Sequence, residues 1–370
     1  MKVADLVRAL EEAAPRAMAE EWDNVGLLTG DPNAPVTRVM LAIDCTREVV
    51  DEAARLACQA IVAYHPPIFR PMTRVTHGSI AYELVRRDIA VYSPHTALDA
   101  AVGGTNDVLA DALGMDATRA PIRASAATDA AYKLVTFVPS DALARVSDAL
   151  FEAGAGRIGD YRACSFRSNG TGTFFGEAGT TPAVGRAGQM ETVDEVRLET
   201  LVPIARVGDA VRALRASHPY EEPAFDLVKL AAAPSGNESE GGKRGMGRIG
   251  EIAPIDRAAL VARVKERLAI DRVLVAGPTS GAVTRIAVCA GSAGDLLDAA
   301  MKLGAQAIVT GEVRHHDALR VAASGVTVIC ALHSNSERIA LPPLAKRLRA
   351  ALDGVDIVLS AVDRDPFVIQ

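Results

Sequence analysis

Two histidine–carboxylate pairs offer the clearest chemistry in this sequence. His95 and Asp99 form one pair, and His333 and Glu337 form the other, so each carboxylate follows its imidazole by four residues. Residues four apart face the same way if the segment turns helically. Imidazole and carboxylate together suit zinc, iron, manganese or nickel. The spacing alone is common in helices, so a metal site also needs a fold that brings the two pairs together.

The segments that precede these pairs have the pattern of buried parallel strands. The apolar runs Val36–Asp44, Ala60–Ala63 and Ile89–Tyr92 alternate with the helical patterns 47–58 and 104–113. This alternation predicts a mainly parallel sheet covered on both faces. Ligands bind such sheets at the carboxyl ends of the strands. Five of the seven histidines lie at or just past such an end: His65, His95, His315, His316 and His333.

The C-terminal part of the chain repeats the first part. The sequence VTRV at 36–39 reappears as VTRI at 283–286, and QAIV at 59–62 reappears at the same offset at 306–309. The third strands correspond as well, at 89–92 and 327–330. Matches held at one offset predict an α/β fold in which two similar halves form one split, internally repeated domain. The repeat superposes both histidine–carboxylate pairs.

Different material separates the two halves. Strand patterns occur at 132–139, 160–167, 172–175, 195–203 and 224–230, and helical patterns occur at 141–153 and 207–216. Their order is close to β-α-β-β-α-β, the ferredoxin-like arrangement. A stretch rich in Gly, Ser and charge then indicates a linker. We therefore expect a split domain at 1–128 and 248–370, an inserted α+β domain at 129–232 and a linker at 233–247.

Composition limits the classes of function. The 370 residues carry a formal net charge of -6, which argues against a general nucleic-acid binder but leaves room for a small anionic or nucleotide substrate held by metal. The five cysteines have no paired spacing, which favours reduced thiols. The N-terminus forms an amphipathic helical pattern without a secretory signal, and no window reaches the ~20 apolar residues of a membrane span. We expect a cytoplasmic protein without membrane segments.

Further polar residues lie near the expected cleft, and each has two interpretations. His315 and His316 begin a helix after Gly311 and Glu312. They are either solvated residues at a helix start or residues that hydrogen-bond to the metal ligands, with His316 able to donate a proton. Asp23 and Asn24 form a turn that either lines the cleft or has no further role.

An ordered set of motifs resembles one known family. The motifs are WDNVGL at 22–27, YHPPIF at 64–69, SPHTALD at 93–99, TGE at 310–312 and HSNSE at 333–337. They resemble the NGG-interacting-factor-three-like family, whose members are often labelled dinuclear metal centre hexameric proteins or type-two GTP cyclohydrolase homologues. The motif HPYEEP at 218–223 is similar to the PII-like, ferredoxin-fold insert of longer members.

The resemblance implies two divalent metal ions and a homohexamer. Carried over to this sequence, the implied ligands are His65, Asp99, His333 and Glu337. Tyr64 stands where many members have a further histidine. Because a phenol is a poor ligand unless ionised, the second ion is expected to be held less firmly, with His95 or a water completing its site.

Two functions are compatible with these residues. The first is a metal-dependent hydrolase of nucleotide-like or phosphoester substrates, with Glu337 or His316 moving protons. GTP ring opening is implied by the family label alone. The second is non-enzymatic: metal trafficking, or a metal-dependent regulatory or scaffold protein.

Overall fold

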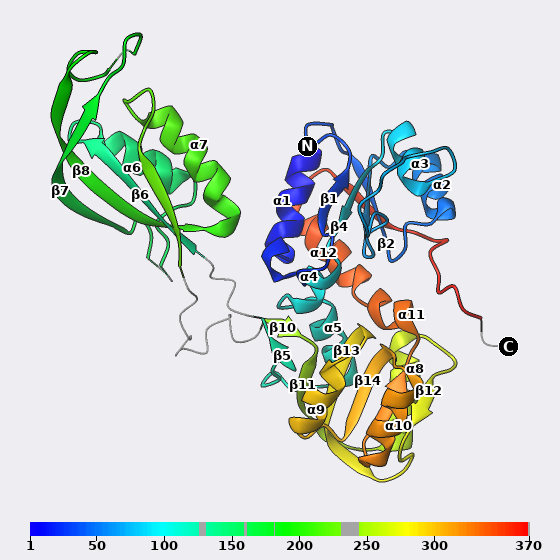
Figure 1. Cartoon of the computed structure of the whole chain (residues 1–370). Helices are drawn as coiled ribbons and strands as arrows, with labels where there is room; N and C mark the ends of the chain where they lie inside the picture. The colour runs from blue at the N-terminus through cyan, green and yellow to red at the C-terminus, as the bar shows by residue number, and fades with distance from the viewer. Residues whose placement is uncertain (126–130, 159–160, 181, 231–243, 369–370) are drawn as a thin grey trace. The chain divides into compact units, whose positions relative to one another are not determined.

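The chain forms two compact units (Figure 1). The computed structural model describes residues 1–370 apart from 126–130, 159–160, 181, 231–243 and 369–370. Unit 1 combines Met1–Ala126 with Asn237–Gln370, and unit 2 comprises Ala127–Gly236. Most of the predicted linker lies outside the described residues. Its end, Gly245–Met246, is strand β10, which pairs with β5 (Arg123–Ala124).

The first sheet of unit 1 has the strand order β1-β4-β3-β2-β16. Its strands are β1 (Gly26–Thr29), β2 (Arg38–Ala42), β3 (Ala60–Ala63), β4 (Ala90–Ser93) and β16 (Asp356–Leu359). All are parallel except β1, which runs antiparallel to β4. Alternate residues serve two cores because successive side chains of a strand point to opposite faces. Leu41 packs with α1 (Val3–Ala13) and α12 (Leu341–Ala351), whereas Met40 packs with α2 (Arg47–Arg55) and α3 (Ile80–Arg86).

The second sheet of unit 1 has the order β11-β13-β14-β15-β12. Its strands are β11 (Arg248–Asp256), β12 (Leu274–Ala276), β13 (Ala282–Ser292), β14 (Ala307–Glu312) and β15 (Thr327–Cys330). The three central strands are parallel and the two outer ones are antiparallel to their neighbours. Helices α5 (Thr105–Leu113) and α8 (Arg257–Leu268) share one core with the sheet, and α9 (Leu296–Lys302) and α10 (His315–Ala323) share the other.

One glutamine makes the same contacts in each sheet. Gln59 Oε1 accepts hydrogen bonds from the backbone N–H groups of Thr37 and Arg38, at 2.9 and 3.0 Å. Gln306 Oε1 accepts the corresponding bonds from two residues of β13, Thr284 and Arg285, at 2.7 and 3.1 Å. Each glutamine therefore fixes the start of the first central strand against the second.

Unit 2 is an antiparallel sheet with two helices. In chain order its elements are β6 (Ala131–Pro139), α6 (Leu143–Glu152), β7 (Ser165–Phe175), β8 (Met190–Pro203), α7 (Val207–Ser217) and β9 (Phe225–Lys229). The sheet order is β7-β8-β6-β9, and the helices share one core with it. The expected separate strand at 172–175 is wrong. Both Gly170 and Gly172 remain extended and pair with β8, so β7 continues through them to Phe175.

The C-terminal segment returns to the first sheet. After β16, Asp363 accepts a hydrogen bond from the backbone N–H of Ile43 at 2.7 Å and pairs with Arg338. Glu52 of α2 accepts a bond from the backbone N–H of Ala361 at 3.1 Å. The end of the chain thus ties β2 to the residue that follows Glu337. No helix in the described part of the chain is long and apolar enough to cross a membrane.

Candidate metal centre

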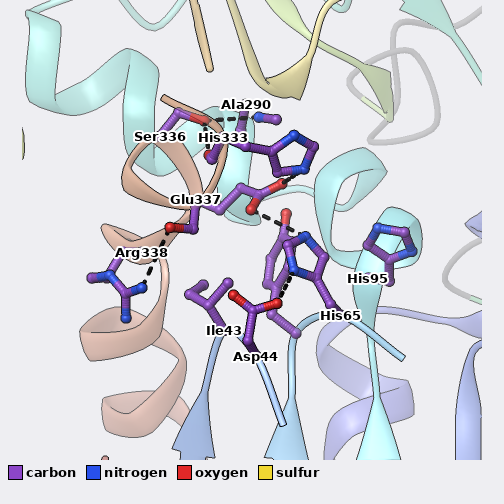
Figure 2. A network of polar contacts seen from close by, with 12 residues as sticks. Ile43, Asp44, His65, His95, Ala290, His333, Ser336, Glu337 and Arg338 are labelled. Atoms are coloured by element: carbon purple, nitrogen blue, oxygen red, sulfur yellow. Dashed lines mark hydrogen bonds and ion pairs between the residues drawn. The ribbon is translucent and has the colours of Figure 1, made fainter. Parts of the chain in front are cut away.

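Three ligand atoms from distant parts of the chain converge in unit 1 (Figure 2). His65 follows β3, and His333 and Glu337 lie on the short helix α11 (His333–Arg338) after β15. Their ligand atoms all lie within 4.8 Å of one another. Glu337 Oε2 is 3.2 Å from His65 Nε2, and Glu337 Oε1 is 3.2 Å from His333 Nε2. The carboxylate therefore lies between two imidazoles, one from each sheet.

A second carboxylate orients each of these imidazoles. His65 Nδ1 donates to Asp44 at 2.9 Å, and His333 Nδ1 lies 3.1 Å from a carboxylate oxygen of Glu312. Histidines that bind metals almost always have such a partner on the far nitrogen, which fixes the ring and its tautomer. Sequence reasoning did not select Asp44 or Glu312 as site residues. Their position was a signal, since Asp44 follows β2 closely and Glu312 ends β14, at the carboxyl ends of central strands.

His95 has the same kind of partner. Its Nδ1 donates to Asp23 at 2.8 Å, and its ring centre lies 5.3 Å from that of His65. The Asp23 carboxylate also accepts bonds from the backbone of Asn24 and from Thr96. Burial opposes ionisation of Asp23, but its bonds from His95 and Thr96 lower its pKa. Asn24 Nδ2 donates to the backbone oxygen of Ile68 at 2.6 Å. The turn at 23–24 therefore holds both His95 and the loop after His65.

Asp99 lies apart from the three converging atoms. It is on helix α4 (His95–Ala100), is buried, and accepts a hydrogen bond from the Tyr64 hydroxyl. That hydroxyl is also 3.0 Å from Thr105 Oγ1. Burial and the charge of Glu337 raise the pKa of Asp99 to about 6. Asp99 thus interacts electrostatically with Glu337, and its closest hydrogen-bonding partner is a phenol rather than an imidazole.

The charges at the centre are strongly coupled. The bond to Glu337 raises the pKa of His333 to about 9. Burial alone would lower the pKa of His65, but its bond to Asp44 and the charge of Glu337 raise it to about 10. Burial opposes ionisation of Glu337, yet the two imidazoles hold its pKa below the usual value. Without metal, an anionic carboxylate therefore stabilises two imidazolium groups.

These residues fit a divalent cation. His65 Nε2 and Glu337 Oε2 are buried and have no hydrogen-bond partner of normal geometry among the described residues. Buried polar atoms normally have hydrogen-bond partners. Two neighbouring nitrogen and oxygen atoms without a hydrogen bond therefore indicate a missing ligand. Gly291 leaves the space open, because a Cβ there would lie 2.6 Å from Glu337 Oε1. An ion held by two nitrogens and a carboxylate would satisfy these atoms.

The backbone is strained at two positions near the centre, at His95 and at the residue before His333. His95 has φ +27° and Leu332, directly before His333, has φ +69° with ψ +154°. Such conformations cost non-glycine residues about 1–3 kcal/mol and are found at functional sites. His315 and His316 are exposed at the start of α10, where their ring centres are 5.4 Å apart, and neither belongs to the group of converging ligand atoms.

Comparison with known proteins identifies the family. The model of Duf34/NIF3 (NGG1p interacting factor 3) matches residues 1–366. The chain belongs to the Duf34/NIF3 family. It is 36% identical over 379 residues to a GTP cyclohydrolase 1 type 2 homolog of Halalkalibacterium halodurans, with 99% of each chain covered. It is 34% identical to the protein of the same name in Bacillus subtilis, with 98% of this chain and 97% of that one covered.

Solved structures agree with this assignment. A Bacillus cereus protein related to NIF3 matches with a TM-score of 0.73 and 33% identity, covering 100% of this chain and 99% of the other. A Staphylococcus aureus protein matches with a TM-score of 0.69 and 30% identity over the same shares. The resemblance inferred from the motifs is therefore confirmed, and the α/β architecture of this Duf34/NIF3 chain agrees with that of its solved relatives.

Proposed function

We propose that this protein is a metal-dependent hydrolase of nucleotide-like or phosphoester substrates. The convergence of His65, His333 and Glu337, each imidazole held by an outer carboxylate, is the observation that supports it most strongly. A bound divalent ion would supply a water of lowered pKa and would polarise a substrate oxygen. The relatives' name, GTP cyclohydrolase 1 type 2 homolog, motivates GTP as the first substrate to test.

The chain's own residues divide the remaining work. Glu337 lies between the ligand nitrogens and can accept a proton from a water at the centre. His95 can be a second proton acceptor when no second ion is bound, because its Nδ1–H donates to Asp23 and its Nε2 then has a free lone pair. His316 was the alternative from the sequence, but among the residues that the structure describes its ring contacts only that of its neighbour His315.

We propose a second ion beside the first, with Asp99 as its ligand and Glu337 shared between the two. The Tyr64 hydroxyl donates a hydrogen bond to Asp99, which orients this carboxylate but occupies one of its oxygens. His95, 6.0 Å from Tyr64 between ring centres, is the imidazole available to complete that site. The second ion should therefore be held more weakly than the first.

We also propose that the two sheets of unit 1 are repeated halves, and that 129–232 is a PII-like insert in the split domain 1–128 and 248–370. The matching Gln59 and Gln306 contacts and the three parallel central strands of each sheet support the repeat. The order β6-α6-β7-β8-α7-β9 supports the insert. The homohexamer is proposed from the family resemblance, and the cytoplasmic location from the five cysteines, which have no paired spacing.

Turnover tests the proposed function. The zinc- or manganese-loaded protein is incubated with GTP, other nucleotides and simple phosphoesters, and products are separated by chromatography. We expect hydrolysis that Glu337→Gln abolishes and that His95→Gln lowers by roughly 10²-fold or more, whereas His316→Ala leaves it unchanged. Circular dichroism checks that each variant is folded. If no substrate turns over while metal exchanges freely with a chelator, the alternative of metal trafficking is correct.

A further inference from the structure

Unit 2 contains a cavity of about 590 Å³ that the metal centre does not explain. Leu198 of β8 packs into the core beneath the helices, whereas its neighbours on the other face of the strand, Glu195 and Arg197, line the cavity. Phe137, Phe174 and Tyr220 also line it. The volume is within the ~300–1,000 Å³ typical of small-molecule sites.

The charges around this cavity do not balance. Three carboxylates line it, from Glu195, Glu221 and Glu222, and none forms an ion pair with a residue that the structure describes. Arg197 is the cation in the lining, but its Nε already donates to Glu199 at 2.8 Å. The cavity therefore has uncompensated negative charge and repels anions.

One polar atom in the lining lacks a partner. The Tyr220 hydroxyl is buried and makes no hydrogen bond of normal geometry within the described residues. Burial and the Glu195 carboxylate, which lies close enough to take the hydroxyl proton in a hydrogen bond, raise the pKa of this phenol, so it stays neutral and its oxygen can accept a hydrogen bond from a ligand. A buried polar atom without a partner, facing an open volume, indicates that a ligand supplies the partner.

The loop that presents these groups is fixed by His218. The Tyr220 backbone N–H donates to His218 Nδ1 at 3.1 Å, and His218 Nε2 donates to the Phe137 backbone oxygen at 3.0 Å. These bonds hold the start of the 218–223 motif against β6. The motif that the sequence singled out thus positions Tyr220, Glu221 and Glu222 at the cavity.

A metal ion does not match this arrangement. Within the described ranges, the only group of three or more metal-ligating side chains close enough to share an ion is that of the centre in unit 1. Separated carboxylates together with aromatic rings instead suit a larger cation. Carboxylates accept strong hydrogen bonds from ammonium or guanidinium groups, and aromatic faces attract the same groups.

We propose that this cavity binds a small organic cation, with an ammonium or guanidinium group beside Glu195 and Tyr220 and an apolar body against Phe137 and Phe174. This site is separate from the metal centre and does not depend on the proposed hydrolase activity. Gly172 provides room for the Glu195 carboxylate, because a Cβ at Gly172 would lie 2.1 Å from Glu195 Oε2.

Three probes of similar size test the charge preference. The full-length protein is titrated with 2-phenylethylamine, neutral 2-phenylethanol and anionic 3-phenylpropanoate, and binding is measured by calorimetry and ligand-observed NMR. We expect the amine to bind roughly tenfold or more tightly than the alcohol, and the anion not to bind. Equal binding of all three probes, or of none, overturns the proposal.

Matched variants locate the binding site. We expect Glu195→Gln to weaken amine binding roughly tenfold, while Glu152→Gln, on α6, leaves it unchanged. Gly172→Ala displaces the Glu195 carboxylate and should also weaken binding. Gly208→Ala, on α7, adds the same methyl group at a residue that does not line the cavity and is its control. If Gly172→Ala and Glu195→Gln instead change the assembly mass in sedimentation and the wild type binds no amine, the face is an interface between copies and the proposal is wrong.

Discussion

Metal binding should release close to two protons per chain near neutral pH. In the metal-free protein the pKa of His65 is raised to about 10 and that of His333 to about 9, so both imidazoles are protonated there. A metal binds the unprotonated nitrogen, and each imidazole must therefore lose one proton as the ion enters. The pKa of Asp99 is raised only to about 6, so its carboxylate contributes little to this release.

The pH dependence of the metal affinity follows from the two protons that must leave before one ion can bind. The apparent affinity for zinc should rise by about two orders of magnitude per pH unit below about pH 9, which is about 2.7 kcal/mol per unit. Calorimetric titration at about pH 7.5 in buffers of different ionisation enthalpy measures the number directly, as the slope of heat against buffer enthalpy. Glu337→Gln removes the carboxylate that raises both pKa values and should reduce the release, whereas His316→Ala should not change it.

The same pKa values set the stability of the metal-free protein. Because both imidazole pKa values are raised on folding, their stabilising contribution is fully present below the unfolded pKa of about 6.5. It declines as the pH rises above that value and is gone once the pH has passed about 9 to 10. The melting temperature should therefore fall between about pH 6.5 and pH 10. For the metal-binding experiment, release of fewer than about one proton per chain, or a zinc affinity that does not change between about pH 6 and pH 8, would refute the assignment of these imidazoles as ligands.

Three further substitutions test other parts of unit 1. Arg248→Met removes the two bonds that the guanidinium donates to the buried Asp107 carboxylate, which keeps its bonds from Arg119 and Gly103, and should lower the free energy of unfolding in urea by about 1.5–3 kcal/mol; a loss below about 0.5 kcal/mol would contradict this. Gln59→Ala and Gln306→Ala each remove two hydrogen bonds that the glutamine side chain accepts from the backbone, and each should lower the free energy of unfolding by about 1–3 kcal/mol. Unequal losses would argue against equivalent roles. Tyr64→His should increase the zinc bound per chain in elemental analysis, with Tyr82→His as the control; an unchanged ratio would show that the phenol does not limit the second ion.

The sequence predicted the elements around the centre well because their signals are local. Apolar runs of four residues at 60–63 and 327–330 coincide with β3 and β15, and the spacing of His333 and Glu337 matches the turn of α11. The continuous strand β7 was missed because Gly170 and Gly172 usually weaken strands, and only pairing with β8 across the sheet keeps them extended.

The details of the centre could not be predicted because they depend on contacts distant in sequence. Asp44 is one of many acidic residues, and its role emerges only when β3 places His65 beside it. The two interpretations of Asp23 were equal from the sequence. The structure distinguishes them, since this carboxylate accepts a bond from His95, 72 residues away along the chain. Burial that raises the pKa of Asp99 likewise results from tertiary packing.

The position of β16 has a consequence for synthesis on the ribosome. This strand, Asp356–Leu359, pairs with β2, and Asp363 just beyond it bonds the backbone of Ile43 about 320 residues earlier. The first sheet therefore lacks this edge strand until about 320 further residues have been synthesised after β2, and the edge of β2 stays unpaired during that part of elongation. Removal of β16 and Asp363 would damage a sheet whose other strands are synthesised long before them.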